Sequence, residues 1–272
     1  MKFTRLFLFA AVLLLAVSTV SFASDPAAIL LDQTVQRISA VFANLDKTLS
    51  ETAKKLGKAP DPRIDMRAEI RSLCADKPYA IDCSFLNAQG VIQLVEPQQF
   101  RKFEGTSLAS QAVTAHIINT KKPVLTDLFT GVEDRQAVVA SYPVFNKNKE
   151  YVGSTGVFFT PEVLIQKAIE GLPLGKGVQI DVLQRDGTSV FALDPAQRRK
   201  NILRDPEYSG FSELRDLGAR IVKEPEGTGR YRYLIPGGQQ VARKRALWKT
   251  VTLYDNFWRV VVTQEETAEQ KR

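Results

Sequence analysis

A regular spacing of apolar residues near the start of the chain constrains the fold more than any other feature. Apolar residues recur three and four positions apart from Leu31 to Leu56, as they do on one face of an α-helix. Asp25-Pro26 supplies an N-terminal cap and a proline for the first turn, and we expect Gly57 to end the helix in a left-handed conformation. The spacing predicts one helix of about 30 residues and about 45 Å, whose apolar face must pack on its own domain or on a partner helix.

Residues 1–23 have the pattern of a secretory signal peptide. Lys2 and Arg5 precede an apolar run from Leu6 to Val20, and small residues then lead to a cleavage site near Ala23. The run is shorter than the roughly 20 apolar residues that a membrane-spanning helix needs. The leader predicts a periplasmic or secreted protein, and the alternative is a protein anchored in the membrane by an uncleaved signal.

Cys74 and Cys83 are the two cysteines of the chain and lie nine positions apart. Outside the cytoplasm cysteines are readily oxidised, so we expect a disulfide that joins the end of a helix to the first strand of the following sheet. Closing so short a loop stabilises the folded chain by about 2.7 kcal/mol on the chain-entropy estimate. The alternative is a pair of buried thiols, and the spacing differs from the Cys-x-x-Cys pattern of redox sites.

The composition narrows the classes of function. The chain has a net charge of +7 with basic and acidic residues interspersed, which argues against a nucleic-acid partner. One histidine and two cysteines leave few ligands for a metal, and we expect neither a metal nor another cofactor. The single histidine, His116, has no Gly-x-Ser-x-Gly motif to act with, so the sequence favours binding over catalysis and we expect no enzyme.

A strand, a tight turn and a second strand occur twice in the chain, about 100 residues apart. The first copy consists of Ile81–Phe85 with a turn at Asn87–Gly90, and the second of Ile180–Gln184 with a turn at Asp186-Gly187. Each copy continues with a helical segment and ends in antiparallel strands. We therefore predict an internal duplication and an α+β fold, in which the long N-terminal helix is followed by two lobes that each contain an antiparallel sheet.

Several short motifs follow one another in the order and at the spacing of a known family. They are Gly105–Leu108, Lys122–Asp127, Ser141–Phe145 with the turn to Gly153, Asp186-Gly187, Asp205–Tyr208 and Trp258–Val262. On these residues the chain resembles the double Cache sensor domain, a pair of extracytoplasmic PAS-like lobes behind a long helix. The resemblance extends over residues 25–266.

The resemblance implies a division of the chain and a place for a ligand. After the signal peptide we expect a helical segment at 24–77, a PAS-like lobe of the membrane-distal type at 78–171, a second PAS-like lobe at 172–266 and a polar tail at 267–272. Members of the family are usually the outer parts of chemoreceptors, histidine kinases and cyclases, and their distal lobe commonly holds a small organic ligand. We expect a small carboxylate or amine in the first lobe.

Two departures from the family refine these expectations. The strand Gly156–Thr160 lacks the acidic residue that amino-acid-binding members carry there, which disfavours an amino-acid ligand. The polar tail after Thr263 contains no second membrane helix and no signalling module, so the chain resembles a free-standing sensor.

Five side chains are candidates for the first-lobe ligand site: Arg101, Phe103, His116, Asp127 and Tyr142. Arg101 could bind a ligand carboxylate through two parallel hydrogen bonds, or it is a surface arginine beside core phenylalanines such as Phe103. Asp127 could accept from a ligand amine or pair with Arg101, or it is a cap or salt-bridge partner. Tyr142 could offer its hydroxyl to the pocket or pack in the core, and His116 faces either the pocket or the surface.

Two functions are compatible with these features. The first is a periplasmic sensory protein that binds a small molecule and has no transmembrane signalling module of its own. The second is an interaction protein whose long helix docks onto a membrane-bound sensor or onto a second copy of the chain. They differ in whether the apolar stripe from Leu31 to Leu56 is covered by the two lobes or left exposed.

Overall fold

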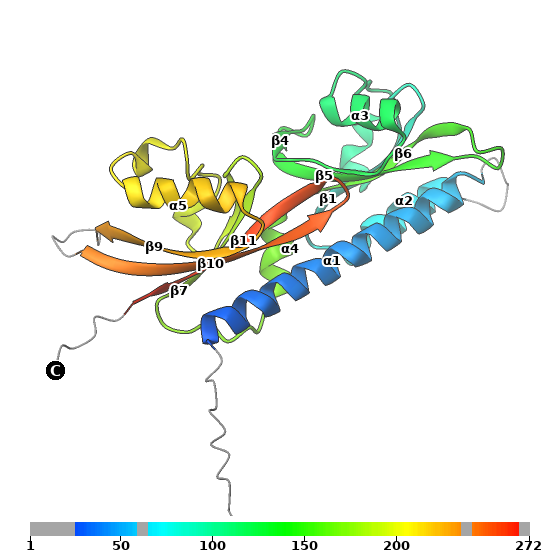
Figure 1. Cartoon of the computed structure of the whole chain (residues 1–272). Coiled ribbons are helices and arrows are strands. Elements are labelled where there is room, and N and C mark those ends of the chain that lie inside the picture. The colour runs from blue at the N-terminus through cyan, green and yellow to red at the C-terminus, as the bar shows by residue number, and fades with distance from the viewer. Residues whose placement is uncertain (1–24, 59–64, 235–240, 267–272) are drawn as a thin grey trace, which may run out of the picture.

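The computed structural model describes residues 25–58, 65–234 and 241–266. The predicted signal peptide and the predicted polar tail lie outside these ranges. Within them, no helix combines the length and the hydropathy that crossing a membrane requires. Two antiparallel sheets follow one another along a single long helix (Figure 1), which is the α+β arrangement predicted from the sequence.

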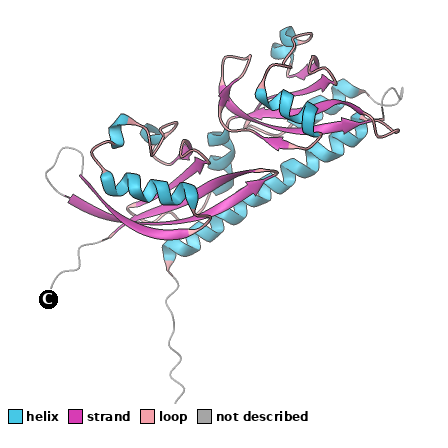
Figure 2. Cartoon of the chain, turned by 45° about the horizontal axis from the view of Figure 1, so that its top comes forward, coloured by secondary structure: helices cyan, strands magenta, loops and turns pink. Residues whose placement is uncertain are grey.

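The long helix α1 (Pro26–Leu56) supports both lobes. It begins as predicted, because Asp25 Oδ1 accepts a hydrogen bond from the Ala27 N–H at 3.1 Å. Figure 2 shows the helix running under both sheets, and its inward side chains, among them Ile38 and Leu45, are fully buried. The two lobes of the chain itself therefore cover the apolar stripe.

Gly57 ends α1, but the predicted left-handed conformation is wrong. Its φ of −67° and ψ of −11° are right-handed, a backbone conformation that any residue can adopt, so the conformation does not require glycine here. Glycine is required because there is no space for a side chain: a Cβ atom at this position would lie 2.0 Å from the carbonyl oxygen of Phe145, at the end of a first-lobe strand. Close packing between the helix end and the sheet explains the glycine.

We expect Gly57→Ala to destabilise the protein by about 2 kcal/mol, because the new methyl group must displace the strand backbone. Helix propensity alone predicts the opposite sign, since alanine is favoured over glycine by about 1 kcal/mol in a helix. Urea unfolding measures the difference, and Ala43→Gly on the exposed face of α1 gives the propensity effect by itself. A gain in stability for Gly57→Ala would mean that the strand end moves freely.

A short helix and a disulfide fasten the end of α1 to the first sheet. Helix α2 (Met66–Cys74) packs against α1 and against the first strand, β1 (Ala80–Asn87). Cys74, at the end of α2, is bonded to Cys83 in β1. The structure thus contains the expected disulfide, and it joins the two kinds of element that the sequence predicted.

The first lobe is a sheet with the strand order β2-β1-β6-β5-β3, in which the short β4 also pairs with β5. One face of the sheet packs on α1 and the other lies under α3 (Figure 1). The remaining elements of this lobe are β2 (Ile92–Glu96), η1 (Gln98–Phe103), α3 (Ala112–Thr120), β3 (Val124–Leu125), β4 (Phe129–Thr130), β5 (Gln136–Phe145) and β6 (Tyr151–Phe159).

Helix α4 (Pro161–Ile169) leads to the second lobe, a sheet with the strand order β8-β7-β11-β10-β9. This sheet also packs one face on α1, and α5 covers the other (Figure 1). The elements are β7 (Val178–Gln184), β8 (Ser189–Ala192), η2 (Pro195–Gln197), η3 (Pro206–Tyr208), α5 (Ser212–Lys223), β9 (Gly227–Leu234), β10 (Val241–Leu253) and β11 (Asn256–Glu265).

The two sheets correspond strand by strand. In each, the hairpin that opens the lobe lies at one edge, and the last strand of the lobe, β6 or β11, inserts between that hairpin and the strand before it. The common order supports the internal duplication predicted from the sequence. Each lobe consequently has an equivalent face, under α3 or under α5, on which a ligand could bind.

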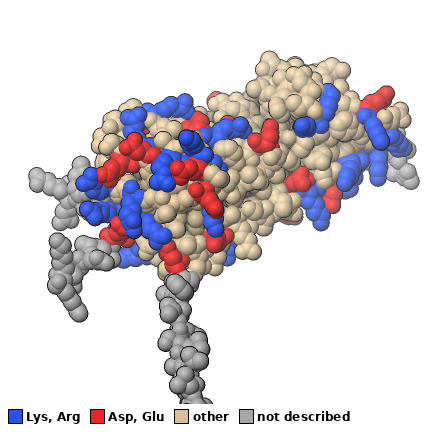
Figure 3. Space-filling model, in the orientation of Figure 1, with Lys and Arg blue, Asp and Glu red and all other residues tan. Residues whose placement is uncertain are grey.

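The charged side chains are unevenly distributed over the face shown in Figure 3. Basic and acidic side chains are interspersed over the second lobe, whereas the surface around α3 of the first lobe is mostly uncharged. Part of the charge on the second lobe is paired, as in the contact of Arg232 on β9 with Glu213 on α5. On this face the second lobe is the more highly charged of the two.

Candidate functional site

The alternation of side chains along the second sheet separates a core face from an open face. On β7, Ile180 and Val182 are buried on the side of α1, whereas Gln179 and Asp181 face α5. The neighbouring strand β11 adds Thr263 to the open face. Polar side chains from the middle of the sheet are thereby gathered under α5.

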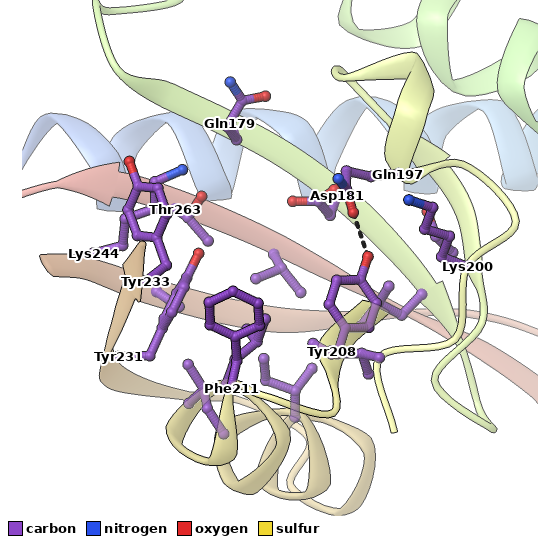
Figure 4. A pocket seen from close by; sticks show the side chains of 18 of the residues that line it. Gln179, Asp181, Gln197, Lys200, Tyr208, Phe211, Tyr231, Tyr233, Lys244 and Thr263 are labelled. Carbon is purple, nitrogen blue, oxygen red and sulfur yellow. Dashed lines mark hydrogen bonds between the residues drawn. The ribbon is translucent and has the colours of Figure 1, made fainter. Parts of the chain in front are cut away.

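A cavity of about 330 Å³ lies between this open face and α5, and we call it the second-lobe cavity. Figure 4 shows its lining side chains, which come from the sheet on one side and from η2, η3 and α5 on the other. Cavities that hold small organic ligands measure about 300–1,000 Å³. The second-lobe cavity is large enough for a small organic molecule.

Four aromatic rings line the second-lobe cavity, those of Tyr208, Phe211, Tyr231 and Tyr233 (Figure 4). The Tyr208 hydroxyl donates a hydrogen bond to Oε1 of Gln197. Burial raises the pKa of the Tyr208 and Tyr231 hydroxyls, so both stay neutral at physiological pH. The walls therefore combine apolar ring faces with hydroxyl groups that can donate or accept.

Asp181 places a carboxyl group on the sheet side of the second-lobe cavity (Figure 4). Burial raises the pKa of Asp181 to about 7, the nearby charge of Lys244 opposes this rise, and that of Asp194 adds to it. Among the described residues, none donates a hydrogen bond that lowers the pKa of this carboxyl. At neutral pH this carboxyl group therefore ionises less readily than that of an exposed aspartate.

The other charged groups that line the second-lobe cavity each have a partner in an ion pair, a hydrogen bond or a cation–π contact. Lys200 forms an ion pair with Glu207. Asp194 Oδ1 accepts a hydrogen bond from a backbone N–H at the start of η2, at 2.9 Å. The ammonium group of Lys244 lies 4.4 Å from the centre of the Tyr233 ring. Asp181 is therefore the charged lining group with the least compensation from its neighbours.

The equivalent face of the first lobe holds a much smaller cavity, of about 50 Å³, next to α3. It is lined by side chains such as Ser84, Thr114 and Phe158. Since one water molecule takes up about 30 Å³ in the liquid, this space accommodates water and no organic ligand. In this conformation the lobe in which the sequence predicted a ligand offers less room than the other.

Two of the predicted ligand residues, Arg101 and Phe103, lie in η1. Arg101 Nη2 donates to Glu96 Oε1 at 2.5 Å. The guanidinium therefore pairs with a carboxylate five residues away, at the end of β2, and not with Asp127, a pairing that the sequence left open as one alternative. Phe103 packs on an apolar cluster on the outer side of the first sheet. Neither lines the first-lobe cavity, and their role in binding stays a prediction.

A third predicted residue, Asp127, lies at the junction of the two lobes. Its Oδ2 is 3.3 Å from Nε of Arg185 in the second lobe. Its Oδ1 accepts a hydrogen bond at 3.1 Å from the side chain of Asn256, in β11. The structure thus shows Asp127 in the salt-bridge role that the sequence left open.

The last two predicted residues also lie at the lobe junction. His116 Nε2 on α3 is 3.7 Å from Oδ2 of Asp255, in the turn between β10 and β11. The ring centre of Tyr142 is 6.4 Å from that of Tyr254 in the same turn, and Tyr142 packs on the core that surrounds α1. The structure therefore brings together three of the five candidates, but between the lobes and away from either cavity.

The sequence alone did not point to the second-lobe cavity, although β7 contains a usable signal. Gln179 and Asp181 alternate there with apolar residues in a strand that has neighbours on both sides. Polar side chains on the non-core face of an inner strand indicate a lined cavity, since a packed face would be apolar. Within the described ranges no group of three or more metal-ligating side chains accompanies it.

Residues 40–161, which include much of α1 and the first lobe, match the family described as HK/GC/Chemotaxis protein-like, sensor domain. No curated protein sequence matches the chain. The match covers somewhat less than half of the chain, and the description of the family is consistent with the kind of sensor domain that the sequence resembles.

Solved structures of sensor proteins share the fold over nearly the whole chain. An extracellular ligand-binding receptor from Desulfohalobium retbaense is similar over 89% of this chain and 41% of its own, with 25% identity and a TM-score of 0.72. The periplasmic sensory domain of the Campylobacter jejuni chemoreceptor Tlp1 has 14% identity and a TM-score of 0.61, over 88% of this chain and 93% of that domain. The ligand-binding domain of the Pseudomonas aeruginosa amino acid chemoreceptor PctB, in complex with L-Gln, has 11% identity and a TM-score of 0.59, over 88% and 90%.

These similarities establish the fold of the chain. The chain has the double Cache fold of extracytoplasmic sensor domains, as its sequence predicted. It spans less than half of the Desulfohalobium receptor, and its similarity to the two chemoreceptor domains is one of fold.

Proposed function

We propose that this chain binds a small organic molecule, without transforming it, and does so in the second-lobe cavity. The observation that carries the proposal is the difference between the lobes: about 330 Å³ lined by four aromatic rings and a carboxyl group in one, about 50 Å³ in the other. A largely apolar cavity with a few oriented polar groups is the usual form of a small-molecule site. The first-lobe ligand predicted from the sequence stays a prediction.

The cellular setting of this proposal comes from the sequence. The signal-peptide pattern of residues 1–23 supports a periplasmic or secreted location, and the similar sensor domains are described as extracellular or periplasmic. The proposal includes a membrane-bound protein as the partner that would receive the signal of ligand binding.

The alternative function, docking through the long helix, loses its main support. The apolar stripe on which it depends is buried, and side chains such as Phe42 and Leu49 in it are at most 1% exposed. A partner or a second copy of the chain would have to bind the polar outer face of α1, where Gln36 and Arg37 are exposed. Such docking stays a prediction.

We expect Leu214→Trp to abolish ligand binding and Val113→Trp to leave it intact. Leu214 on α5 lines the second-lobe cavity, and Val113 lies at the matching place on α3, next to the first-lobe cavity. Both side chains are half-buried and each lines its own cavity, so each indole fills a different one. The measurement is the shift in melting temperature against a panel of small amines, carboxylates and amino acids. A ligand at a hundred times its Kd stabilises the folded state by about 2.7 kcal/mol.

The matched pair also identifies the lobe that binds. Loss of the shift in Val113→Trp but not in Leu214→Trp would move the site to the first lobe and contradict the proposal. A panel that shifts neither variant nor the wild-type protein would contradict it as well.

A further inference from the structure

Resting on the proposed function, we infer that the second-lobe cavity takes a protonated organic amine with an apolar body, whose ammonium group pairs with Asp181. The carboxyl group lines the same cavity as the four aromatic rings (Figure 4). A cavity lined by a carboxylate and aromatic rings suits organic cations, because both attract positive charge while the rings also bury apolar surface.

The protein already uses one of these rings to hold an ammonium group. The Nζ atom of Lys244 lies 4.4 Å from the centre of the Tyr233 ring, within the distance of about 6 Å at which a cation is attracted to a ring face. Tyr231 lies beside Tyr233, with ring centres 6.3 Å apart. The aromatic wall therefore suits a cation by a contact that the structure itself displays.

The acidic group Asp181 and the basic group Lys244 lie at different positions along the strands that line the second-lobe cavity. Asp181 on β7 and Trp248 on β10 both pair with Val261 on β11, so they lie in one row across the sheet. Lys244 is four residues from Trp248 along β10, about 13 Å away at 3.3 Å per residue. The two groups therefore start from separate points of the sheet, so a ligand ammonium at Asp181 leaves Lys244 on the Tyr233 ring, although the charge of Lys244 still acts on Asp181.

The remaining charged groups around Asp181 favour a positive ligand. Lys200 is neutralised by Glu207, which leaves Asp181 and Asp194 against Lys244, and Tyr208 is neutral. One added positive charge balances this set. An amine that pairs with Asp181 also stabilises its carboxylate, so binding of the amine and loss of the Asp181 proton are coupled. Because burial raises the pKa of Asp181 to about 7, affinity for an amine should increase between pH 6 and pH 8.

Four probes of one shape and different charge test the inference by calorimetric titration at pH 8: 2-phenylethylamine, 2-phenylethanol, 3-phenylpropionate and phenylalanine. We expect the amine to bind at least about tenfold more tightly than the alcohol, as a charge-assisted contact provides. The amine is protonated across this range, as a lysine side chain is. Its affinity should fall at pH 6 while that of the alcohol stays constant.

Two variants separate this inference from the proposed function. Asp181→Asn keeps the shape of the cavity and removes the charge, so we expect the amine to bind only as well as the alcohol, with no dependence on pH. The control Asp216→Asn makes the same change on the exposed side of α5 and should bind like the wild-type protein.

Each other outcome has a defined meaning. Equal affinity for amine and alcohol, or strongest binding of the propionate or of phenylalanine, overturns the amine inference and leaves the second-lobe cavity as the site. If none of the four probes binds the wild-type protein, the amine inference fails, and the cavity itself is judged by the paired tryptophan variants.

Discussion

Asp181→Asn is expected to raise the free energy of unfolding at pH 8 by up to about 4 kcal/mol. In an unfolded chain an aspartate ionises near pH 4, whereas burial raises the pKa of Asp181 in the folded protein to about 7. The carboxylate present at pH 8 therefore opposes folding, and asparagine has the same shape without the charge. The figure is an upper bound, because any water that enters the second-lobe cavity would stabilise the carboxylate.

The direction of the pH dependence follows from proton binding. Between about pH 4 and pH 7 the unfolded state has lost a proton that folded Asp181 keeps, so stability falls as the pH rises through this window and levels off above it. Burial also raises the pKa of Asp82 and of Glu133, and these two carboxyls add a fall of the same sign. Because Asp181→Asn retains them, the difference between the two stability curves isolates Asp181.

Urea unfolding at pH 5 and at pH 8 provides the measurement. The gain from Asp181→Asn should be small at pH 5 and large at pH 8, while Asp216→Asn on the exposed surface should change little at either pH. A gain of equal size at both values would mean that the folded protein ionises Asp181 as readily as the unfolded chain does. Such a result would also remove the reason to expect pH-dependent amine binding.

The helix start, the disulfide and the repeated sheets could be predicted from the sequence because each depends on residues that are close together along the chain. Asp25 caps α1, and Cys74 meets Cys83 across one short connection. The repeated strand-turn-strand unit likewise became two sheets of one order. The conformation of Gly57 was mispredicted because the requirement for glycine comes from Phe145, far along the chain.

The ligand site was less accessible to sequence reasoning, for two different reasons. The core position of Tyr142 could have been predicted from the sequence. Tyr142 lies two residues from Ala140 and from Val144 in β5, on the face where these residues and Val138 are buried in the core. The volume of the cavity under each covering helix could not be predicted from the sequence, because it depends on how α3 and α5 pack on their sheets. The resemblance directed attention to the first lobe, whereas the larger cavity formed around Asp181 in the second.

Glu96→Ala is expected to destabilise the protein by about 3 kcal/mol, the lower end of the range for breaking a buried ion pair. Glu96 is only 3% exposed at the end of β2, and its Oε1 accepts hydrogen bonds from Arg101 at 2.5 Å and from Arg67 at 3.2 Å. Its loss leaves Arg101 without its partner, while Arg67 keeps Glu104 at 2.9 Å. The effect should stay near the lower end because both arginines are partly exposed and can turn toward water.

The pH dependence at Glu96 has the opposite sign to that at Asp181. Burial by itself would raise the pKa of Glu96, but hydrogen bonds from Arg101 and Arg67 outweigh it and lower the pKa below its ordinary value. The stabilisation is therefore complete above about pH 4.5 and is lost as the pH falls further. Urea unfolding at pH 7 and pH 4 measures it, and Arg71→Gln is the control, since Arg71 is 63% exposed and 3.8 Å away. Unchanged stability in Glu96→Ala would mean that Arg101 is not committed to this contact, and the carboxylate-binding role that the sequence predicted for Arg101 would then regain support.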